Sequence, residues 1–396
     1  MDLRISEIQE KYKEDKIKFE KPSYKKLYKN YIEHQIAEEK LLIEYKSDRI
    51  CLKDFKKIKE SNIYDLHQKY FHDPEFMSDI SCIVNSILGK DIEHPDKDLT
   101  KKIKNLKRRG AESVNGLAYK ATLLEDEKEV LVVKHSNRED YDLIHEASVG
   151  ILALNKLKSK VPNFSYIFGI HYCPLKNKTD SDWCPKKGKR FPYVIYENIE
   201  PSTTLYVYAK NKSVSEIMNV YLQVMLALNV ANKSCNFTHY DLHTENVLMK
   251  ELKSPVLVAY PYKNKKVYMK AETHIPMIID YGHSYFKYDN RNFGYPQQSS
   301  TFWASGTNNT SKPLNDAYKL LASLGIQELN YFTKEDHEKF TLEMNNLYNL
   351  FPNIDRLVNK SLEDWIDLLN DKYNIFLYEP IPNYDIIDEG KYIYSK

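Results

Sequence analysis

The strongest constraint on the fold is a change of hydrophobic periodicity near Arg109. Before it, apolar residues such as Ile32 and Ile36 recur at helical spacing in a stretch rich in Lys and Glu. After it, the segments 118–124 and 129–136 are strand-like and flank an acidic turn, which predicts a β-hairpin. Because the two periods occupy separate stretches of the chain, we expect an α+β fold.

The order of the later segments indicates two lobes. A helical stripe over 141–157 and strand-like segments at 165–173 and 192–199 are followed by a long helical stripe over 214–233. Strands with one helix among them therefore precede a helical part. This order predicts a bilobal arrangement in three parts: a helical N-terminal extension, a small β-rich lobe and a helical lobe, over 1–105, 106–200 and 201–396.

Charge and length exclude some classes of protein. The chain has 396 residues, enough for two or three domains with sizeable cores. Lys and Arg number 58 against 56 Asp and Glu, a formal charge of only +2. Nucleic-acid-binding proteins usually carry a clear basic excess, so there is no strong nucleic-acid signal. The local basic run 101–109 is either a contact patch or a solvated helix end or linker, and we favour the second interpretation.

The sequence also bears on location. It holds no run of about 18 apolar residues, so no membrane span is expected. The N-terminus lacks the apolar core of a signal peptide. The five cysteines are scattered and odd in number, which is typical of a reducing compartment. We expect a cytoplasmic protein, and for a viral one the host cytoplasm or the virion.

One short segment is crowded with polar side chains. Within eight residues lie His239, Asp241, His243, Glu245 and Asn246. Such crowding is unfavourable through desolvation and charge repulsion unless the site has a task. About thirty residues later an apolar strand ends in Asp280. Two carboxylates and an amide on loops after strands suit a divalent cation bound with phosphates, since Mg²⁺ prefers one or two carboxylates and lets phosphate and water complete its shell.

These motifs resemble those of the protein kinase family. The catalytic loop H-R-D-x-x-x-x-N of that family is matched by His239-Tyr240-Asp241 with Asn246 five residues later, and its D-F-G by the triplet that begins at Asp280. The resemblance covers about 106–330. It implies a kinase-like fold of a β-rich and a helical lobe.

The resemblance extends upstream to the expected nucleotide-binding residues. "LVVK" resembles the V-A-I-K of the family and places Lys134 on its third strand, with Glu146 on the next helix as the paired carboxylate and Glu139 as a weaker candidate. The glycine-rich loop is thin, meaning that it has fewer glycines than the family pattern. If the segment that begins at Gly116 occupies the last glycine position, the nucleotide-binding positions of the loop are Ala111, Ser113, Gly116 and Ala118.

Further positions follow from the same resemblance. Tyr196 is expected at the back of the adenine pocket, and the backbone of Glu197 and Ile199 at the adenine edge. Asp316 begins a helix that resembles the D-x-[WY] helix start of the family. It is expected either to hold the backbone of the catalytic loop or to be an ordinary carboxylate at a helix N-terminus.

Departures from the family pattern carry information. Tyr240 replaces the arginine that receives an activation-loop phosphate in many members, which argues against control by that route. His243 stands where serine/threonine kinases usually have lysine. No A-P-E motif lies between Gly282 and Asp316, and the insert 255–276 lies outside the usual pattern. Together these features look most similar to the serine/threonine kinases of giant and other large DNA viruses.

The resemblance implies an ATP-dependent phosphotransferase. Lys134 would contact the phosphates, Asn246 and Asp280 would bind Mg²⁺ or Mn²⁺, and Asp241 would accept the proton of the attacking hydroxyl. His243 is expected near the γ-phosphate. The expected substrate is a serine or threonine hydroxyl of a protein, including the chain itself.

Two alternatives remain open. One is a small-molecule kinase, which the "DLH" triplet 241–243 and the missing A-P-E favour. The other is a pseudokinase that acts as a binding module, which the thin glycine loop favours. The helical extension 1–105 is interpreted as packing against the rest or as a docking site for a partner.

Overall fold

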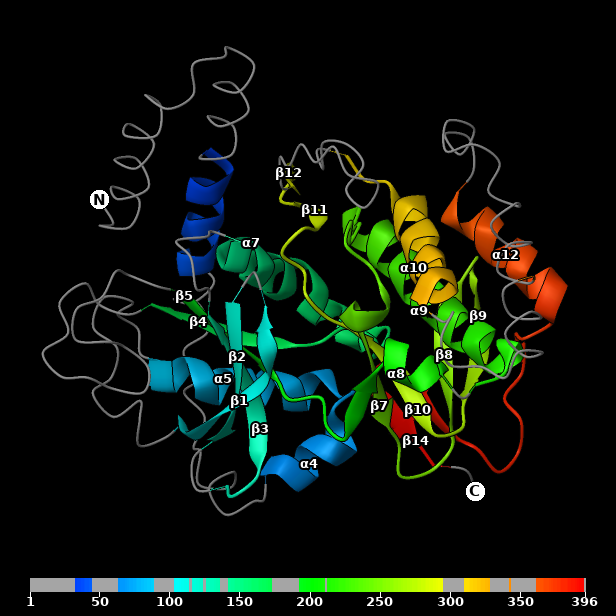
Figure 1. Cartoon of the computed structure of the whole chain (residues 1–396), viewed down its shortest axis with the longest axis horizontal. Helices are drawn as coiled ribbons and strands as arrows, with labels where there is room; N and C mark the ends of the chain where they lie inside the picture. The colour runs from blue at the N-terminus through cyan, green and yellow to red at the C-terminus, as the bar shows by residue number, and fades with distance from the viewer. Residues whose placement is uncertain are drawn as a thin grey trace, which may run out of the picture. The chain divides into compact units, whose positions relative to one another are not determined.

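The computed structural model forms two compact units, which Figure 1 shows as ribbons. Unit 1 comprises described residues within Met1–Phe71, Glu75–Leu152 and Tyr166–Asn198, and unit 2 those within His72–Pro74, Ala153–Ser165 and Ile199–Lys396. The structure describes residues 33–44, 63–88, 103–113, 116–123, 126–135, 142–172, 192–210, 212–294, 310–327, 342 and 361–394. Both helices and sheets are present, which confirms the α+β class.

Unit 1 is built on a five-stranded antiparallel sheet. Its strand order is β1-β2-β3-β5-β4. The strands are β1 (Ile103–Ser113), β2 (Gly116–Leu123), β3 (Glu129–His135), β4 (Ile167–Tyr172) and β5 (Pro192–Glu197). The predicted hairpin is present as β2 and β3, which pair from Leu117 opposite His135 to Thr122 opposite Glu129.

The strand β1 corrects the interpretation of the basic run 101–109 as a helix end or linker. It pairs with β2, with a register shift between Lys104 and Lys107. Asn105 lies in this shift with φ +56°, a left-handed conformation that asparagine tolerates better than most residues. Such a bulge interrupts the alternation of side chains along a strand, which explains why the sequence pattern did not reveal it.

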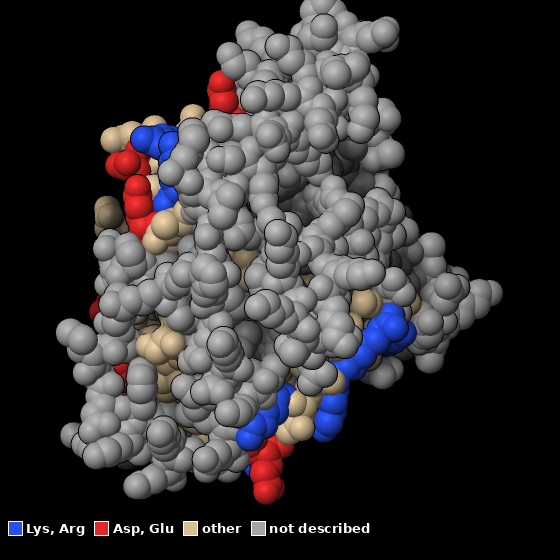
Figure 2. Space-filling model, turned by 90° about the vertical axis from the view of Figure 1, so that its left-hand side faces the viewer, with Lys and Arg blue, Asp and Glu red and all other residues tan. Residues whose placement is uncertain are grey.

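Basic residues near β1 have acidic neighbours. Lys107 pairs with Glu129 at 2.6 Å, and Lys128 pairs with Asp65 at 3.1 Å. Figure 2 shows Lys and Arg side chains along the lower right of one face, with Asp and Glu side chains beside Lys and Arg at the lower end of this row and at the upper left. Two of the lysines in this part of unit 1 are therefore paired with carboxylates.

The two faces of the sheet are covered by different helices. Side chains alternate between faces along a strand, so Leu131 and Val133 of β3 share one face and Lys134 lies on the other. The first face packs in one buried core with residues of α4 (Ile63–Tyr70) and α5 (Pro74–Leu88). The helices α4 and α5 of the predicted extension thus share a core with the sheet, as the packing interpretation expects.

On the opposite face of the sheet, α7 (Asp142–Ser148) packs against β4 and β5. The helical segment 33–44 bonds to this side of unit 1. Glu38 Oε1 lies 2.6 Å from His145 Nδ1 on α7, and the Tyr172 hydroxyl donates to Glu39 Oε1 at 2.7 Å. Both glutamates are buried. Because His145 is next to Glu146, segment 33–44 fixes the helix that carries the predicted partner of Lys134.

Gly150 sets how closely the segment after α7 approaches β4. A Cβ atom at Gly150 would lie 2.3 Å from Cδ1 and 2.5 Å from Cγ1 of Ile167, which is buried. We therefore expect Gly150→Ala to reduce the free energy of unfolding by about 1–3 kcal/mol through overpacking. Urea unfolding followed by circular dichroism measures this loss. Gly150→Ala combined with Ile167→Val should recover part of it, and no recovery would contradict the steric explanation.

Unit 2 centres on a long buried helix. This helix, α9 (Val214–Cys235), begins with a capping box in which Ser213 and Glu216 each satisfy a backbone N–H of the other, and it ends at Asn236 in a left-handed conformation. Among the described helices, only α9 is long and apolar enough to pass a membrane-span test, and 78% of the tested window is buried. A core helix of a folded domain meets the same criterion.

Unit 2 also contains more sheet than a helical lobe was expected to have. Its strands form sheets with the orders β10-β7-β6, β11-β12 and β14-β13-β8-β9. The strands are β6 (Ser202–Thr204), β7 (Val247–Glu251), β8 (Val256–Tyr262), β9 (Lys265–Ala271), β10 (His274–Ile278), β11 (Tyr285–Tyr288), β12 (Arg291–Gly294), β13 (Asp385–Asp388) and β14 (Lys391–Ile393). The remaining helices are α8 (Leu205–Ala209), α10 (Pro313–Gln327) and α12 (Leu362–Tyr373).

The insert 255–276 accounts for much of this extra sheet. It forms the β8–β9 hairpin, whose turn residues Lys263 and Asn264 both have positive φ, as a tight two-residue turn requires. The C-terminal strand β13 then pairs in parallel with β8. Two segments that lie outside the kinase resemblance therefore pair with each other.

His72 provides a pH-sensitive group in unit 2. Burial and the positive charge of Lys158 lower the pKa of His72 from 6.5 to about 4. Between these values the unfolded chain binds a proton that the folded chain does not, so stability is complete above pH 6.5 and is lost as the pH falls toward 4. The loss amounts to about 3 kcal/mol at most.

We therefore expect His72→Gln to unfold with a weaker acid dependence than the natural chain. Urea unfolding at a series of pH values between 7 and 4 measures the difference between the two proteins, in which all other groups cancel. An identical pH dependence in both proteins would show that His72 titrates normally in the folded state.

The cysteines differ partly from expectation. Cys235 is a buried free thiol, and burial raises its pKa to about 11. Cys82 on α5 is disulfide-bonded. The expectation that the cysteines are reduced is therefore wrong for Cys82.

Candidate active site

The crowded segment folds into a loop between α9 and β7. His239 is fully buried, and burial lowers its pKa to about 4, so its ring is neutral. Its Nε2 atom lies 2.9 Å from the carbonyl oxygen of Ile279, and its Nδ1 atom accepts the backbone N–H of Asp241 at 3.3 Å. A neutral imidazole has one donor and one acceptor nitrogen, and both are used. The ring thus ties the loop to the chain just before Asp280.

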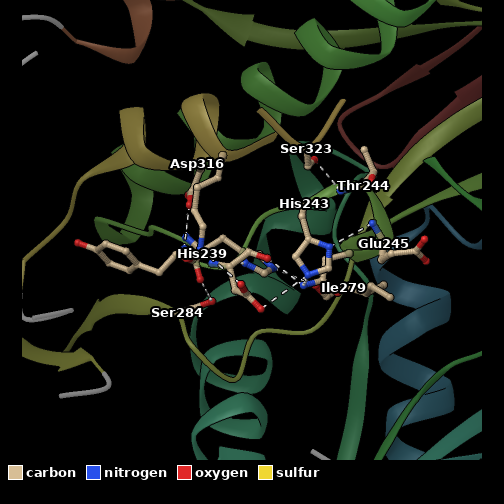
Figure 3. Close-up of polar contacts among 12 residues, drawn as sticks. His239, His243, Thr244, Glu245, Ile279, Ser284, Asp316 and Ser323 are labelled. Atoms are coloured by element: carbon tan, nitrogen blue, oxygen red, sulfur yellow. Dashed lines mark hydrogen bonds and ion pairs between the residues drawn. The ribbon is translucent and has the colours of Figure 1, made fainter. Parts of the chain in front are cut away.

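The helix α10 holds the same loop through its backbone. The two oxygens of Asp316 accept the N–H groups of His239 at 2.7 Å and of Tyr240 at 2.8 Å. Figure 3 shows Asp316 above His239, with Ser323 on the same helix. Ser323 Oγ accepts the N–H of Thr244 at 3.1 Å. Asp316 therefore holds the backbone of the loop 239–246 and also lies in the first turn of α10.

Asp316 is fully buried, and this has an electrostatic consequence. Burial raises its pKa to about 7, against the two backbone hydrogen bonds and Lys319, which favour the charged form. A carboxylate that accepts a hydrogen bond on each oxygen is best matched when ionised. The hydrogen bonds from the backbone amides of His239 and Tyr240 thus offset much of the free-energy cost of desolvating the Asp316 carboxylate.

Two residues near the site have a left-handed backbone. Tyr240 has φ +63° and Asp280 has φ +64°. A tyrosine in this region is uncommon, and such residues gather at functional sites where the surroundings enforce the conformation. At Tyr240 the surroundings are the hydrogen bond from its N–H to Asp316 and the one from its hydroxyl to the carbonyl of Thr310.

Asp280 is held by its neighbours in the chain. Tyr281 is fully buried, and its hydroxyl donates to the carbonyl oxygens of Ile278 at 2.8 Å and Ser165 at 3.1 Å. On the other side, the N–H of Ile279 donates to the carbonyl of Asn246 at 3.0 Å. Since Asp280 follows Ile279 directly, the predicted metal ligands Asp280 and Asn246 lie in neighbouring parts of the backbone.

The amide of Asn246 has a defined orientation. Its Nδ2 donates to the backbone carbonyl of Asp241 at 2.9 Å and lies 3.1 Å from His243 Nε2. Because the nitrogen is engaged in this way, Oδ1 is directed away from these two partners. The residue is largely buried, whereas the side chain of Asp241 is 36% exposed. Asp241 is therefore positioned by its backbone and keeps an accessible carboxylate.

His243 lies beside Asp241 on the same loop. Its Nε2 is 3.8 Å from Asp241 Oδ2, beyond hydrogen-bond distance, and its Nδ1 accepts the N–H of Glu245 at 3.3 Å (Figure 3). The ring is thus fixed by its loop neighbours, and about a third of the side chain is exposed.

Apart from Ile199, the other predicted site residues are in unit 1. Lys134 Nζ lies 2.9 Å from Glu146 Oε2, with side-chain exposures of 17% and 2%. Ala118 is the cross-strand neighbour of Lys134 on β2. Glu139, the weaker candidate for the partner, lies outside the described residues. The pairing that the sequence predicts between Lys134 and Glu146 is therefore present.

The thin glycine loop coincides with the end of the β1–β2 hairpin. Ser113 of β1 is opposite Gly116 of β2, and Ala111 lies two residues before Ser113. The structure describes these three residues only by their backbone, so only their backbone position bears on the prediction.

The expected adenine edge is partly occupied by protein contacts. The N–H of Glu197 donates to the carbonyl of Tyr166 at 2.9 Å. Its carboxylate accepts the N–H of Tyr166 at 2.7 Å and lies 3.1 Å from Nε2 of His67, a residue of α4. The N–H of Glu197 is therefore not free for a ligand. Tyr196 is buried on β5, on the same face of the sheet as Lys134. Ile199 is buried in unit 2.

The structure adds one residue that sequence reasoning missed. Lys319 of α10 donates to the carbonyl of Tyr240 at 2.5 Å and lies 3.4 Å from Asp241 Oδ1. A lysine within a helix usually indicates a solvated face. The available signal was its position three residues after Asp316, on the same side of the helix.

Asp280 and Asn246 offer the kinds of donor atom that a magnesium ion prefers. No group of three His, Cys, Asp or Glu side chains that could hold a metal occurs among the described residues. One carboxylate, Asp280, and one amide oxygen, that of Asn246, are hard oxygen ligands. Mg²⁺ is typically bound by so few protein ligands, together with phosphate and water.

Comparison with known proteins gives matches to viral proteins. No family model matches the chain. It is 27% identical over 166 residues to "Uncharacterized protein 179R" of Invertebrate iridescent virus 6, covering 39% of this chain and 13% of that protein. It is 26% identical over 176 residues to "Probable kinase 098L" of Invertebrate iridescent virus 3, covering 44% of this chain and 30% of that protein.

A third relative gives a similar picture. "Uncharacterized protein 038R" of Invertebrate iridescent virus 3 is 27% identical over 204 residues, which cover 46% of this chain and 37% of that protein. In all three the match spans well under half of the viral protein. The chain is thus distantly similar to parts of iridovirus proteins, and one of these carries the name of a kinase.

Proposed function

We propose that this chain is an ATP- and Mg²⁺-dependent phosphotransferase that phosphorylates serine or threonine hydroxyls of proteins. The observation that carries the proposal is the arrangement of the loop 239–246. Asp316 holds the backbone of this loop, and the ring of His239 anchors it. Asp241 therefore keeps an accessible carboxylate beside an oriented Asn246. Phosphoryl transfer depends on positioning and charge neutralisation more than on covalent chemistry, and a rigid loop meets that need.

Each residue has a proposed role. Asp241 accepts the proton of the attacking hydroxyl, which requires a carboxylate that solvent and substrate can reach. Asn246 and Asp280 bind the metal ion, which neutralises charge on the phosphates. Lys134, kept in place by Glu146, contacts the phosphates of ATP. His243 is close enough to Asp241 to contact the transferred group, in the position where the family usually has lysine.

Two observations outside the loop support this proposal. The five-stranded antiparallel sheet with a helix-borne glutamate paired to a strand lysine is the arrangement that the kinase resemblance implies for a β-rich lobe. The similarity to a protein named a probable kinase points in the same direction.

The proposal is tested with γ-labelled ATP and Mg²⁺. The purified chain is incubated alone and with generic acidic and basic proteins, beside an Asp241→Asn control. Label on serine or threonine of protein in the natural chain only is the expected result. ATP binding without protein labelling would contradict the protein-kinase proposal. In that case transfer to a small molecule would favour the small-molecule kinase, and absence of any transfer would favour the pseudokinase.

A further inference from the structure

Lys319 is a buried lysine in direct contact with the proposed catalytic loop. Its side chain is 6% exposed, and Nζ lies 2.5 Å from the carbonyl oxygen of Tyr240 and 3.4 Å from Asp241 Oδ1. A buried ammonium group is strongly unfavourable unless its donors are matched by acceptors. Here both acceptors belong to the loop, so the lysine and the loop depend on each other.

Lys319 belongs to one face of α10. Residues three and four apart share a helix face, and Asp316, Lys319 and Ser323 follow that spacing. Each of them bonds to the loop: Asp316 accepts backbone N–H groups, Lys319 donates to a backbone carbonyl, and Ser323 accepts a backbone N–H. Along this face of the helix, an acceptor, a donor and a second acceptor therefore pair with complementary backbone groups of the loop.

Lys319 supplies a cation next to the Asp241 carboxylate that the loop itself does not supply. His243 reaches the other carboxylate oxygen, Oδ2, only at 3.8 Å. Among the residues that the structure describes, Lys319 is the only lysine or arginine within 4.0 Å of the Asp241 carboxylate. The cation nearest to Asp241 thus comes from α10 and not from the loop.

We propose that Lys319 is a positioning residue for Asp241. Lys319 holds both the Asp241 carboxylate and the left-handed backbone of Tyr240 in the positions that catalysis requires. Because one donor group binds the carbonyl before Asp241 and the carboxylate of Asp241, it restricts the side chain as well as the chain direction. This inference rests on the proposed function for its catalytic consequence, while the contact itself can be tested without any activity.

The contact is tested by a double-mutant cycle in urea unfolding. The proteins are the natural chain, Lys319→Met, Asp241→Asn and the double variant, with Lys287→Met as a control for loss of an exposed lysine. Lys319→Met is expected to lower the folding equilibrium constant about tenfold or more, since it leaves the Tyr240 carbonyl unmatched. In the Asp241→Asn background its effect should be smaller by at least about threefold. Equal effects in both backgrounds would overturn the inference.

The catalytic consequence is tested by steady-state kinetics. Lys319→Met is expected to lower kcat by about a hundredfold with KM for ATP changed less than about threefold, and Lys319→Arg should restore part of kcat. An unchanged kcat in Lys319→Met would overturn the positioning role. If the natural chain transfers no phosphate but the stability coupling is present, the proposed function fails and the contact stands. If transfer occurs without coupling, the inference alone fails.

Discussion

Asp241→Asn is expected to lower phosphoryl transfer by about 10³-fold, because a general base contributes about 10² to 10⁴ and asparagine cannot accept the proton. The fold of the loop should survive the change. Asn246 binds the backbone carbonyl of Asp241, and His239 binds its backbone N–H, so neither bond involves the lost carboxylate. Affinity for ATP is therefore expected to change by less than about threefold.

Initial rates with labelled ATP and calorimetric titration with ATP measure the two quantities separately. Glu245→Gln is the matched control, because Glu245 is an exposed carboxylate four residues further along the same loop. It should retain nearly the full rate. Asp241 would lose its proposed role if Asp241→Asn kept more than about a tenth of the natural rate, or if Glu245→Gln lost as much.

Most of the candidate site was predicted from short local motifs. Lys134 and Glu146 were predicted as partners from the resemblance of "LVVK" and the helix after it to the protein kinase pattern, and they lie 2.9 Å apart. The loop between Asp241 and Asn246 was predicted from polar crowding within a few residues. In both cases the residues that matter are close in the sequence, so their spacing already restricts their geometry.

Contacts between distant segments were harder to predict. Lys319 is nearly eighty residues from Asp241, and its chemistry resembles that of any surface lysine until the loop is placed against α10. The pairing of β13 with β8 joins residues more than a hundred positions apart. Such contacts depend on tertiary packing, which no local pattern of apolar and polar residues specifies.

The helices before β1 show a different limit. Their helical period was correctly recognised, but the period does not say what a helix packs against. His67 of α4 lies 3.1 Å from Glu197 of β5, with side-chain exposures of 1% and 0%. Segment 33–44 likewise contacts α7 through Glu38. These buried polar contacts make the described helices part of the unit that carries Lys134.

Asp280→Asn is expected to remove the dependence of ATP binding on Mg²⁺ and to lower transfer by about a hundredfold or more. The proposed metal site has one carboxylate and one amide, so this change leaves only neutral protein ligands, which Mg²⁺ binds poorly. Asparagine is chosen because Asp280 has φ +64°, a conformation that Asn tolerates as readily as Asp. The backbone is therefore expected to stay in place while the charge is lost.

Titrations with ATP in the presence and absence of Mg²⁺, at equal ionic strength, measure the effect. In the natural chain Mg²⁺ should strengthen ATP binding, and in Asp280→Asn it should not. Asp289→Asn is the matched control, since Asp289 is an exposed aspartate with φ +46° in the β11–β12 turn. If Asp280→Asn kept the full Mg²⁺ effect, Asp280 would not be a metal ligand. If the control lost it as well, the loss in Asp280→Asn would not be specific to the proposed metal site.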